Sequence, residues 1–76
     1  MKDYDSFNAI FGKKLSVCMA EAEMTPSELS ESSGVSIESI RDYLRKDAAP
    51  LFVTVCKLAE ALGCTPNDLC GWEDQR

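Results

Sequence analysis

The side chains best suited to contact a charged partner gather in one short stretch in the middle of the chain. Arg41, Arg45 and Lys46 supply positive charge there, and Glu38 and Asp42 lie among them. Arginine can donate two hydrogen bonds to a guanine edge, whereas a carboxylate can accept one from the amino group of cytosine. On an arbitrary helix the same charges would be solvated partners of one another at three- and four-residue spacings. The elements that carry them must decide between these interpretations.

The four cysteines do not suggest a metal site or a catalytic nucleophile. Cys18, Cys56, Cys64 and Cys70 include no CxxC pair, and the chain has no histidine. Cys18 and Cys56 fall on apolar helix faces, where cysteine packs as a small hydrophobe. We therefore expect structural thiols, no metal and no other cofactor. Because Ser–His and Cys–His arrangements need a histidine, the sequence also argues against an enzyme.

Length and composition predict one small domain. The chain has 76 residues, of which 45% are hydrophobic, so residues 1–76 are expected to form a single domain with a core of about residues 6–71 and short tails. No stretch resembles a signal peptide or a membrane span, and a cytoplasmic location is expected. The net charge of −5 has the wrong sign for a generic nucleic-acid binder, although the distribution of charge matters more than its sum.

Apolar residues recur at helical spacing, and no segment alternates as a strand would. A first helix is expected to be capped by Asp5 or Ser6 and to end near Glu23. Another begins after Pro50 and is closed by Gly63. The apolar stripes of these two helices are Phe7, Ile10, Phe11, Leu15, Cys18 and Ala22 in the first, and Leu51, Val55, Leu58, Ala59 and Leu62 in the second.

Three further helix starts complete an all-α fold of five short helices. Thr25 is followed by a proline and, at the third helical position, by Glu28, which is the pattern of a capping box. The expected caps are Thr25, Ser36 and Thr65, and the expected ends of these helices are Gly34, about Arg45 and near Gly71.

The second and third predicted helices form a helix–tight turn–helix frame between Pro26 and Tyr43. Gly34 supplies positive φ at the turn, and the small Ser30 lets the two backbones approach. The apolar residues that hold the helices together are Leu29, Val35, Ile40 and Tyr43. This frame is typical of a helix-turn-helix, whose second helix enters the DNA major groove. Arg41 lies on this second helix, and that position favours a DNA-contacting role for it.

The frame and the segments after it resemble the lambda-repressor-like, XRE-type (Cro/cI-like) helix-turn-helix family. The resemblance covers about Phe11 to Leu69 and also rests on Pro50, the run from Lys57 to Gly63, and Asp68 with Leu69. It implies the lambda-repressor-like fold and a sequence-specific DNA-binding transcriptional regulator, expected to be a repressor acting as a homodimer. The implied partner is a double-stranded DNA operator, and a protein antagonist is a further candidate.

The resemblance also implies which residues contact DNA. The third predicted helix would lie in the major groove, and the amides near Pro26 and Ser27 would face a phosphate, which suits a helix N-terminus. Arg45 and Lys46 beyond the third helix, and Lys14 on the first, would reach phosphates. The expected DNA-binding residues are Ser27, Ser36, Ile37, Glu38, Ser39, Arg41, Asp42, Arg45, Lys46 and Lys14.

A homodimer would set two recognition helices about 34 Å apart, one turn of DNA. Phe52, Leu69 and Trp72 are expected at its interface, because large apolar side chains anchor such contacts. The alternative for the same residues is packing against the core.

The chain also departs from its relatives. Many of them bury an arginine–glutamate pair at the positions of Met19 and Leu44, and a joint apolar replacement leaves such a core intact. Pro26 stands where the family often has a DNA-contacting glutamine. Together with the net charge and the acids Glu38 and Asp42, this change leaves a second hypothesis open: a protein-interaction module that keeps the fold but binds DNA weakly or not at all.

Overall fold

A computed structural model describes residues 3–70 and, of their side chains, those from Phe7 onward. This part of the chain contains five helices and no strand, which confirms the predicted all-α fold. The helices are α1 (Asp3–Ala22), α2 (Pro26–Ser33), α3 (Ile37–Leu44), α4 (Phe52–Leu62) and α5 (Pro66–Cys70). No helix among the described residues is both long enough and apolar enough to cross a membrane.

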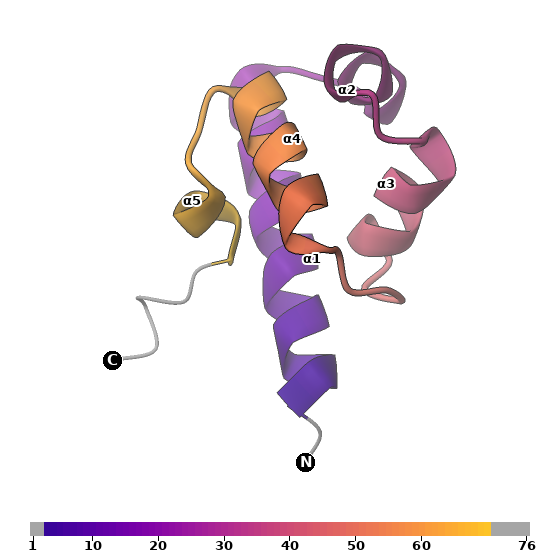
Figure 1. Cartoon of the computed structure of the whole chain (residues 1–76), viewed down its shortest axis with the longest axis vertical. Coiled ribbons are helices and arrows are strands. Elements are labelled where there is room, and N and C mark those ends of the chain that lie inside the picture. The colour runs from indigo at the N-terminus through magenta and orange to yellow at the C-terminus, as the bar shows by residue number, and fades with distance from the viewer. Residues whose placement is uncertain (1–2, 71–76) are drawn as a thin grey trace.

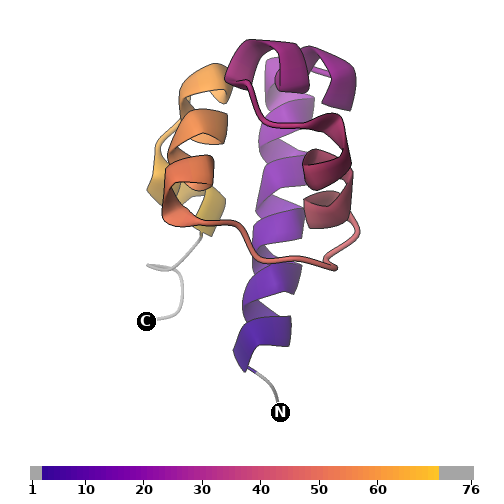
Figure 2. The same cartoon turned by 45° about the vertical axis from the view of Figure 1, so that its right-hand side comes forward.

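The long helix α1 is the axis around which the shorter helices are arranged. Helix α3 lies on one side of α1, α5 lies on the other side, and α2 lies above α3, near the level of the C-terminal end of α1 (Figure 1). The view turned by 45° in Figure 2 keeps α3 and α5 on opposite sides, with α4 beside α5. The fold therefore separates the face that carries α3 from the face that carries α5.

All five helices contribute to one hydrophobic core. Its buried members are Phe11, Leu15, Met19, Leu29, Val35, Ile40, Tyr43, Val55, Leu58, Ala59 and Leu69. The ring of Phe11 stacks on Phe7, and its edge meets the ring of Tyr43 at a centroid distance of 5.5 Å. Met19 is buried and Leu44 packs partly against the core, so both apolar replacements are accommodated as expected.

Two sequence expectations about helix ends are wrong. Helix α1 begins at Asp3, so Asp5 and Ser6 lie inside it and do not cap it. Asp and Ser are also suited to a first turn, and a cap-forming residue type alone does not fix the first residue of a helix. Leu51 is 72% exposed and does not belong to the inward stripe of α4, because it precedes the helix in an extended conformation and the helical spacing does not apply to it.

The other caps form as predicted. Thr25 Oγ1 accepts a hydrogen bond from the Glu28 amide, and Glu28 Oε1 accepts one from the Thr25 amide, which completes the capping box of α2. Thr65 and Asp68 make the same reciprocal pair at the start of α5. Each of these pairs satisfies amides that have no partner within the helix.

Candidate nucleic-acid interface

The turn between α2 and α3 is held by hydrogen bonds as well as by packing. Gly34 has a φ of +82°, in the left-handed region that the tight turn requires. The Ser30 hydroxyl donates to the Val35 carbonyl at 2.7 Å, and the Val35 amide donates to Ser33 Oγ at 3.1 Å. Ser30 therefore does more than leave room for the second helix, because its side chain joins α2 to the far side of the turn.

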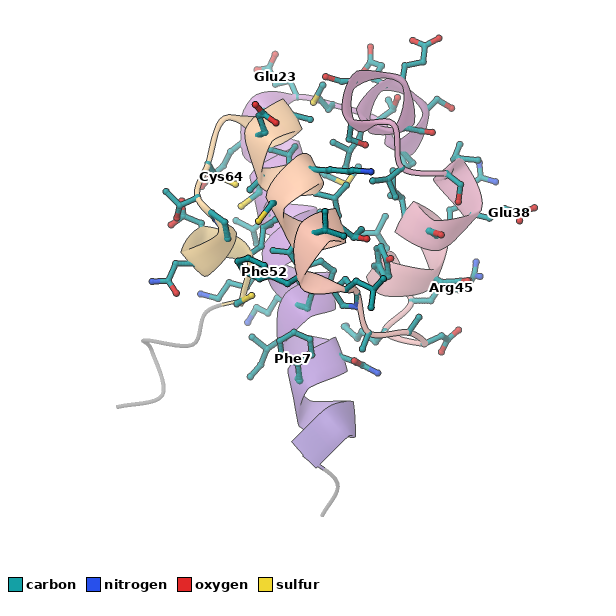
Figure 3. All side chains as sticks on the ribbon, viewed as in Figure 1. Phe7, Glu23, Glu38, Arg45, Phe52 and Cys64 are labelled. Atoms are coloured by element: carbon teal, nitrogen blue, oxygen red, sulfur yellow. The ribbon has the colours of Figure 1, made fainter. Side chains whose placement is uncertain are left out.

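The helix α3 is anchored to the core by its inner face and presents its outer face to solvent. Ile40 and Tyr43 are buried, whereas Glu38 and Arg41 are exposed. Figure 3 shows Glu38 pointing outward from α3, away from the other helices. The inner contacts fix the direction in which the outer side chains project.

A close approach to α1 sets the position of the other end of α3. A Cβ atom on Gly12 would lie 2.6 Å from the Tyr43 carbonyl oxygen and 2.8 Å from Cγ of Lys46. Only a residue without a side chain can sit there, so Gly12 lets the C-terminal end of α3 rest directly on α1. Lys46 follows with a φ of +67°, which turns the chain away from the helix.

The two serine hydroxyls at the start of α3, predicted to face DNA, are bonded to each other. Ser36 Oγ accepts from the Ser39 amide at 3.1 Å, and the Ser36 hydroxyl donates to Ser39 Oγ at 2.9 Å. The cap leaves the Ile37 side chain half-buried and the Glu38 side chain exposed. The first turn of α3 thus offers one apolar and one acidic side chain to a ligand.

The two arginines of this region have different surroundings. Arg45 is paired with Asp42 and, through Nε at 3.4 Å, with Asp47, and its side chain remains 60% exposed. No acidic side chain among the described residues lies within ion-pair distance of Arg41. Arg41 is therefore the cation of α3 that keeps its charge available to a ligand, whereas Arg45 and Asp42 largely cancel each other's charge.

The start of α2 offers less to a phosphate than the sequence suggests. Pro26 has no amide hydrogen, and the Glu28 amide is bonded to Thr25. The Glu28 carboxylate lies beside the Thr25 amide, where it adds negative charge to the helix N-terminus. In the first turn, the exposed Ser27 supplies the amide that remains open.

Lys14 does not join the α3 surface. It is half-buried on α1, and its charge acts on Cys18 and on Asp68, whose pKa it helps to lower. Asp68 lies on α5, which is on the side of α1 away from α3. The residue spacing along α1 identifies its apolar face. It does not show which of the other helices lies next to the residues on either side of that face.

The three residues expected at a dimer interface are placed differently. Leu69 is fully buried and supplies no surface to a partner, so we remove it from the predicted interface. Phe52 is 73% exposed and is flanked by the exposed Leu51 and Val53. We call these three residues the α4 apolar patch. Trp72 lies outside the described residues.

The cysteines of residues 3–70 are all free and half-buried. Within the same residues, no three His, Cys, Asp or Glu side chains are grouped as ligands of a metal ion.

Two features of the interface were missed by sequence reasoning, and a third was left open. The close approach at Gly12 had one signal, a glycine in the middle of an otherwise strong helix. The hydrogen bond from Ser30 had none, since its acceptor is a backbone carbonyl across the turn. The acids that hold Arg45 were visible at helical and near-helical spacing, but spacing does not show which of several charges will pair.

Comparison with known proteins identifies the family. Residues 14–75 match the family model of the Cro/C1-type HTH DNA-binding domain, while no curated protein matches the chain. The chain is also similar to the crystal structure of an HTH_3 family transcriptional regulator from Vibrio cholerae, with a TM-score of 0.86 and 17% identity over 95% of this chain. It spans 40% of that longer protein, and a likeness at this identity shows the fold alone. Because the family model covers most of its length, the chain belongs to the Cro/C1-type (XRE/HTH_3) family of helix-turn-helix DNA-binding domains, a non-enzymatic family of transcriptional regulators.

Proposed function

We propose that this domain is a sequence-specific repressor that inserts α3 into the major groove of an operator as a homodimer. The observation that carries the proposal is the combination of a buried inner face of α3 with an outer face on which Arg41 is exposed and has no acidic partner among the described residues. Repression would follow from occupancy, because a bound dimer excludes other proteins from the same DNA.

The side chains divide into those that would read bases and those that would position the helix. Arg41 would donate two hydrogen bonds to guanine, and Glu38 would accept one from cytosine. Ile37 offers apolar contact to a thymine methyl group. The Ser27 amide and Lys46 would contact phosphates on either side of the groove, which fixes register without reading sequence.

The decisive experiment is selection of bound fragments from genomic DNA, followed by affinity measurements with the Arg41→Ala variant. We expect a defined site, and we expect Arg41→Ala to weaken binding by roughly 5- to 100-fold and to relax the preference at one base pair of each half-site. Lys57→Ala is the matched control, since Lys57 is an exposed cation on α4. If both variants select the same site with the same affinity as the native chain, Arg41 does not read a base.

The α4 apolar patch supports the homodimer. Leu51, Phe52 and Val53 expose large apolar side chains at one end of α4, and a second copy is the partner that a symmetric operator would require. Phe52→Ser should shift the molar mass measured by light scattering from dimer to monomer. Val17→Ser, which changes an exposed valine on α1, should leave the mass unchanged. A Phe52→Ser variant that remains dimeric would exclude this patch as the interface.

A second candidate function is a protein-interaction module that binds DNA weakly or not at all. It is favoured by the net charge of −5, by the Glu28 carboxylate at the start of α2 and by the pairing of Arg45 with two acids. On this hypothesis the α4 apolar patch would take another protein, such as an antagonist. Failure to retard any genomic fragment at low salt, with the protein shown to be folded, would favour this function over the first.

A further inference from the structure

We infer that Gly12 is a positioning residue for DNA binding, because it seats the side chain of Lys46 on α1 and so holds the lysine ammonium group at the end of α3. This role rests on the proposed function, in which Lys46 contacts a phosphate, and it concerns what keeps that contact in place. Gly12 lies in the middle of α1, and Lys46 follows α3. Two segments distant in sequence therefore build one contact.

The backbone holds Lys46 in a conformation that is unusual for a lysine. Its φ is +67°, in the left-handed region. The Lys46 amide donates to the Tyr43 carbonyl at 3.0 Å, and the Asp47 amide donates to the Asp42 carbonyl at 3.0 Å. These are the two hydrogen bonds of a Schellman motif, in which the left-handed residue is usually glycine. The end of α3 therefore sets the direction in which the Lys46 side chain leaves the backbone.

Glycine takes the same left-handed position at the ends of two other helices. Gly34 follows α2 with a φ of +82°, and Gly63 follows α4 with a φ of +76°. Glu23, at the end of α1, is a second exception with a φ of +56°. Of the two exceptions, Lys46 is the one whose side chain lies against a glycine among the described residues. The left-handed lysine and the glycine opposite it form one arrangement.

The stem of the Lys46 side chain rests on the backbone of α1. Its Cγ atom lies 2.8 Å from the place that a Cβ atom on Gly12 would occupy, so a larger residue at position 12 would displace the stem. A lysine can pack its methylene groups in this way while its ammonium group stays in water, and Lys46 is an exposed residue. Because the stem is already seated, less conformational entropy is lost when the ammonium group meets an anion.

The Lys46 ammonium group is available to an anion. No acidic side chain among residues 7–70 lies within ion-pair distance of it, whereas the neighbouring Arg45 is paired with Asp42 and Asp47. A purely structural alternative is that Lys46 only balances the negative end of the α3 dipole, where a cation is favourable. The salt dependence of DNA binding separates these two roles, because it reports the number of phosphate contacts.

The first experiment measures affinity for the selected DNA site at several salt concentrations, for the native chain and for Lys46→Gln. Glutamine keeps part of the stem and removes the charge. The slope of log affinity against log salt concentration should become shallower by about 0.9, and affinity at about 0.1 M salt should fall roughly eightfold. Lys46→Arg should keep the native slope. Lys57→Gln, which removes an exposed cation on α4, is the matched control and should also keep it.

A native slope in Lys46→Gln would overturn the inference. A residue that only balances the helix dipole affects the melting temperature, and its loss does not remove a phosphate contact.

The second experiment tests Gly12 in a double-mutant cycle. Gly12→Ala should make the slope shallower when Lys46 is present, and should have no further effect on the slope in the Lys46→Gln background, because no charge remains to be placed there. The slope is the measured quantity, since a shift of α3 would change affinity in both backgrounds. A Gly12→Ala change that alters the slope equally in both backgrounds, or in neither, would overturn the positioning role.

A measurement on the native chain decides the same question if Gly12→Ala does not fold. In the DNA-free domain, nuclear Overhauser effects should connect the side-chain protons of Lys46 with the α protons of Gly12, because the Lys46 Cγ atom lies against that residue. Their absence would overturn the positioning role. A native chain that binds no genomic fragment would overturn the proposed function as well, whereas an unchanged slope in Lys46→Gln would overturn this role alone.

Discussion

Arg45 is the residue at which sequence and structure give the most different accounts of the interface. The sequence presents it as one of three cations at the end of the recognition helix, and the structure places it between Asp42 and Asp47. An exposed ion pair of this kind contributes little to stability, so the pairing affects mainly what Arg45 can offer to a ligand. On the proposed function, Arg41, which has no acidic partner among residues 7–70, would supply the base-reading cation.

Asp68 is expected to make stability depend on pH in acid. Its hydrogen bonds with Thr65 hold the pKa of the carboxyl below the ordinary value of 3.8. A lowered pKa in the folded state stabilises the protein above 3.8, and this contribution is lost as pH falls through the lowered value. Urea midpoints should therefore differ between the native chain and Asp68→Asn at pH 6, and the difference should shrink below about pH 4.

The control for this prediction is Glu60→Gln on α4, which removes an exposed carboxylate that forms no side-chain hydrogen bond within the described residues. The difference in urea midpoint between Glu60→Gln and the native chain should not shrink below about pH 4 in the way expected for Asp68→Asn. A constant difference for Asp68→Asn from pH 6 down to pH 2 would contradict the assignment.

Glu23 is strained by its position after α1. Its φ is +56°, in the left-handed region where residues with a Cβ are disfavoured, and its carboxylate lies at the negative end of the helix dipole. Glu23→Gly should raise the free energy of unfolding by about 1 kcal/mol, since glycine suits this position and the unfavourable charge is removed. Glu23→Ala separates the two effects in urea melts: if it stabilises as much as Glu23→Gly, backbone strain is not the cause.

At the scale of elements, the fold depends on how α3 is seated between its neighbours. The Ser30 hydroxyl links α2 to the far side of the turn, and Gly12 lets α1 meet the end of α3 without a side chain between them. The first contact sets where α3 begins, and the second sets where it ends.

Gly12→Ala should destabilise the domain even though alanine favours helices. The added Cβ would lie 2.6 Å from the Tyr43 carbonyl oxygen, a backbone atom that cannot move without moving α3. We expect a loss of about 1–3 kcal/mol from this overlap, which exceeds the gain of about 1 kcal/mol in helix propensity. Ser16→Ala, at an exposed position of α1, should be neutral or slightly stabilising in the same urea melts. Equal stability of the two variants would show that the close approach of α1 to α3 does not exclude a Cβ atom at position 12.

The elements could be predicted from sequence because their signals are local. Thr25 with Glu28, Ser36, and Gly34 act through contacts within a few residues, and all of them have their predicted roles. Leu69 could not be distinguished from Phe52 in the same way. Helix α5 has five residues, too few for an apolar period to show which side is buried, and α4 has more apolar residues than one face can hold.

The candidate site was less predictable than the elements because it depends on which helices become neighbours. The resemblance assigned Lys14 to the DNA face, whereas in the structure its charge acts on Asp68 of α5. Spacing along one helix gives the angles between its side chains around the helix axis. Tertiary packing sets which face of the helix is turned toward each neighbouring helix.

At the scale of the whole molecule, the balance of charge decides how the domain meets DNA. The net charge is −5, and the segment from Ser36 to Asp47 is itself neutral, with three acids and three bases. Phosphate contacts supply most non-specific affinity, so binding outside a specific site is expected to be weak. Selectivity for the specific site would then come from weak non-specific binding as much as from strong contacts to bases.

Asp47→Asn should strengthen non-specific DNA binding, if the proposed function is right. The change removes one partner of Arg45 and leaves its guanidinium more available to a phosphate. One additional phosphate contact should steepen the dependence of log affinity on log salt concentration by about 0.9. Asp68→Asn is the matched control, with the same change of charge on α5. Identical salt slopes for the two variants would mean that Arg45 does not contact DNA.

The arrangement of α5 has a practical consequence for tethering this domain. Cys70, at the end of α5, is the last described residue, and α5 and α3 lie on opposite sides of α1 (Figures 1 and 2). A reporter or effector protein joined directly to Cys70 would begin on the side of α1 opposite to α3. If α3 occupies the groove as proposed, a fusion at that point could remain attached, and a fluorescent protein placed there would report on DNA occupancy without competing for it.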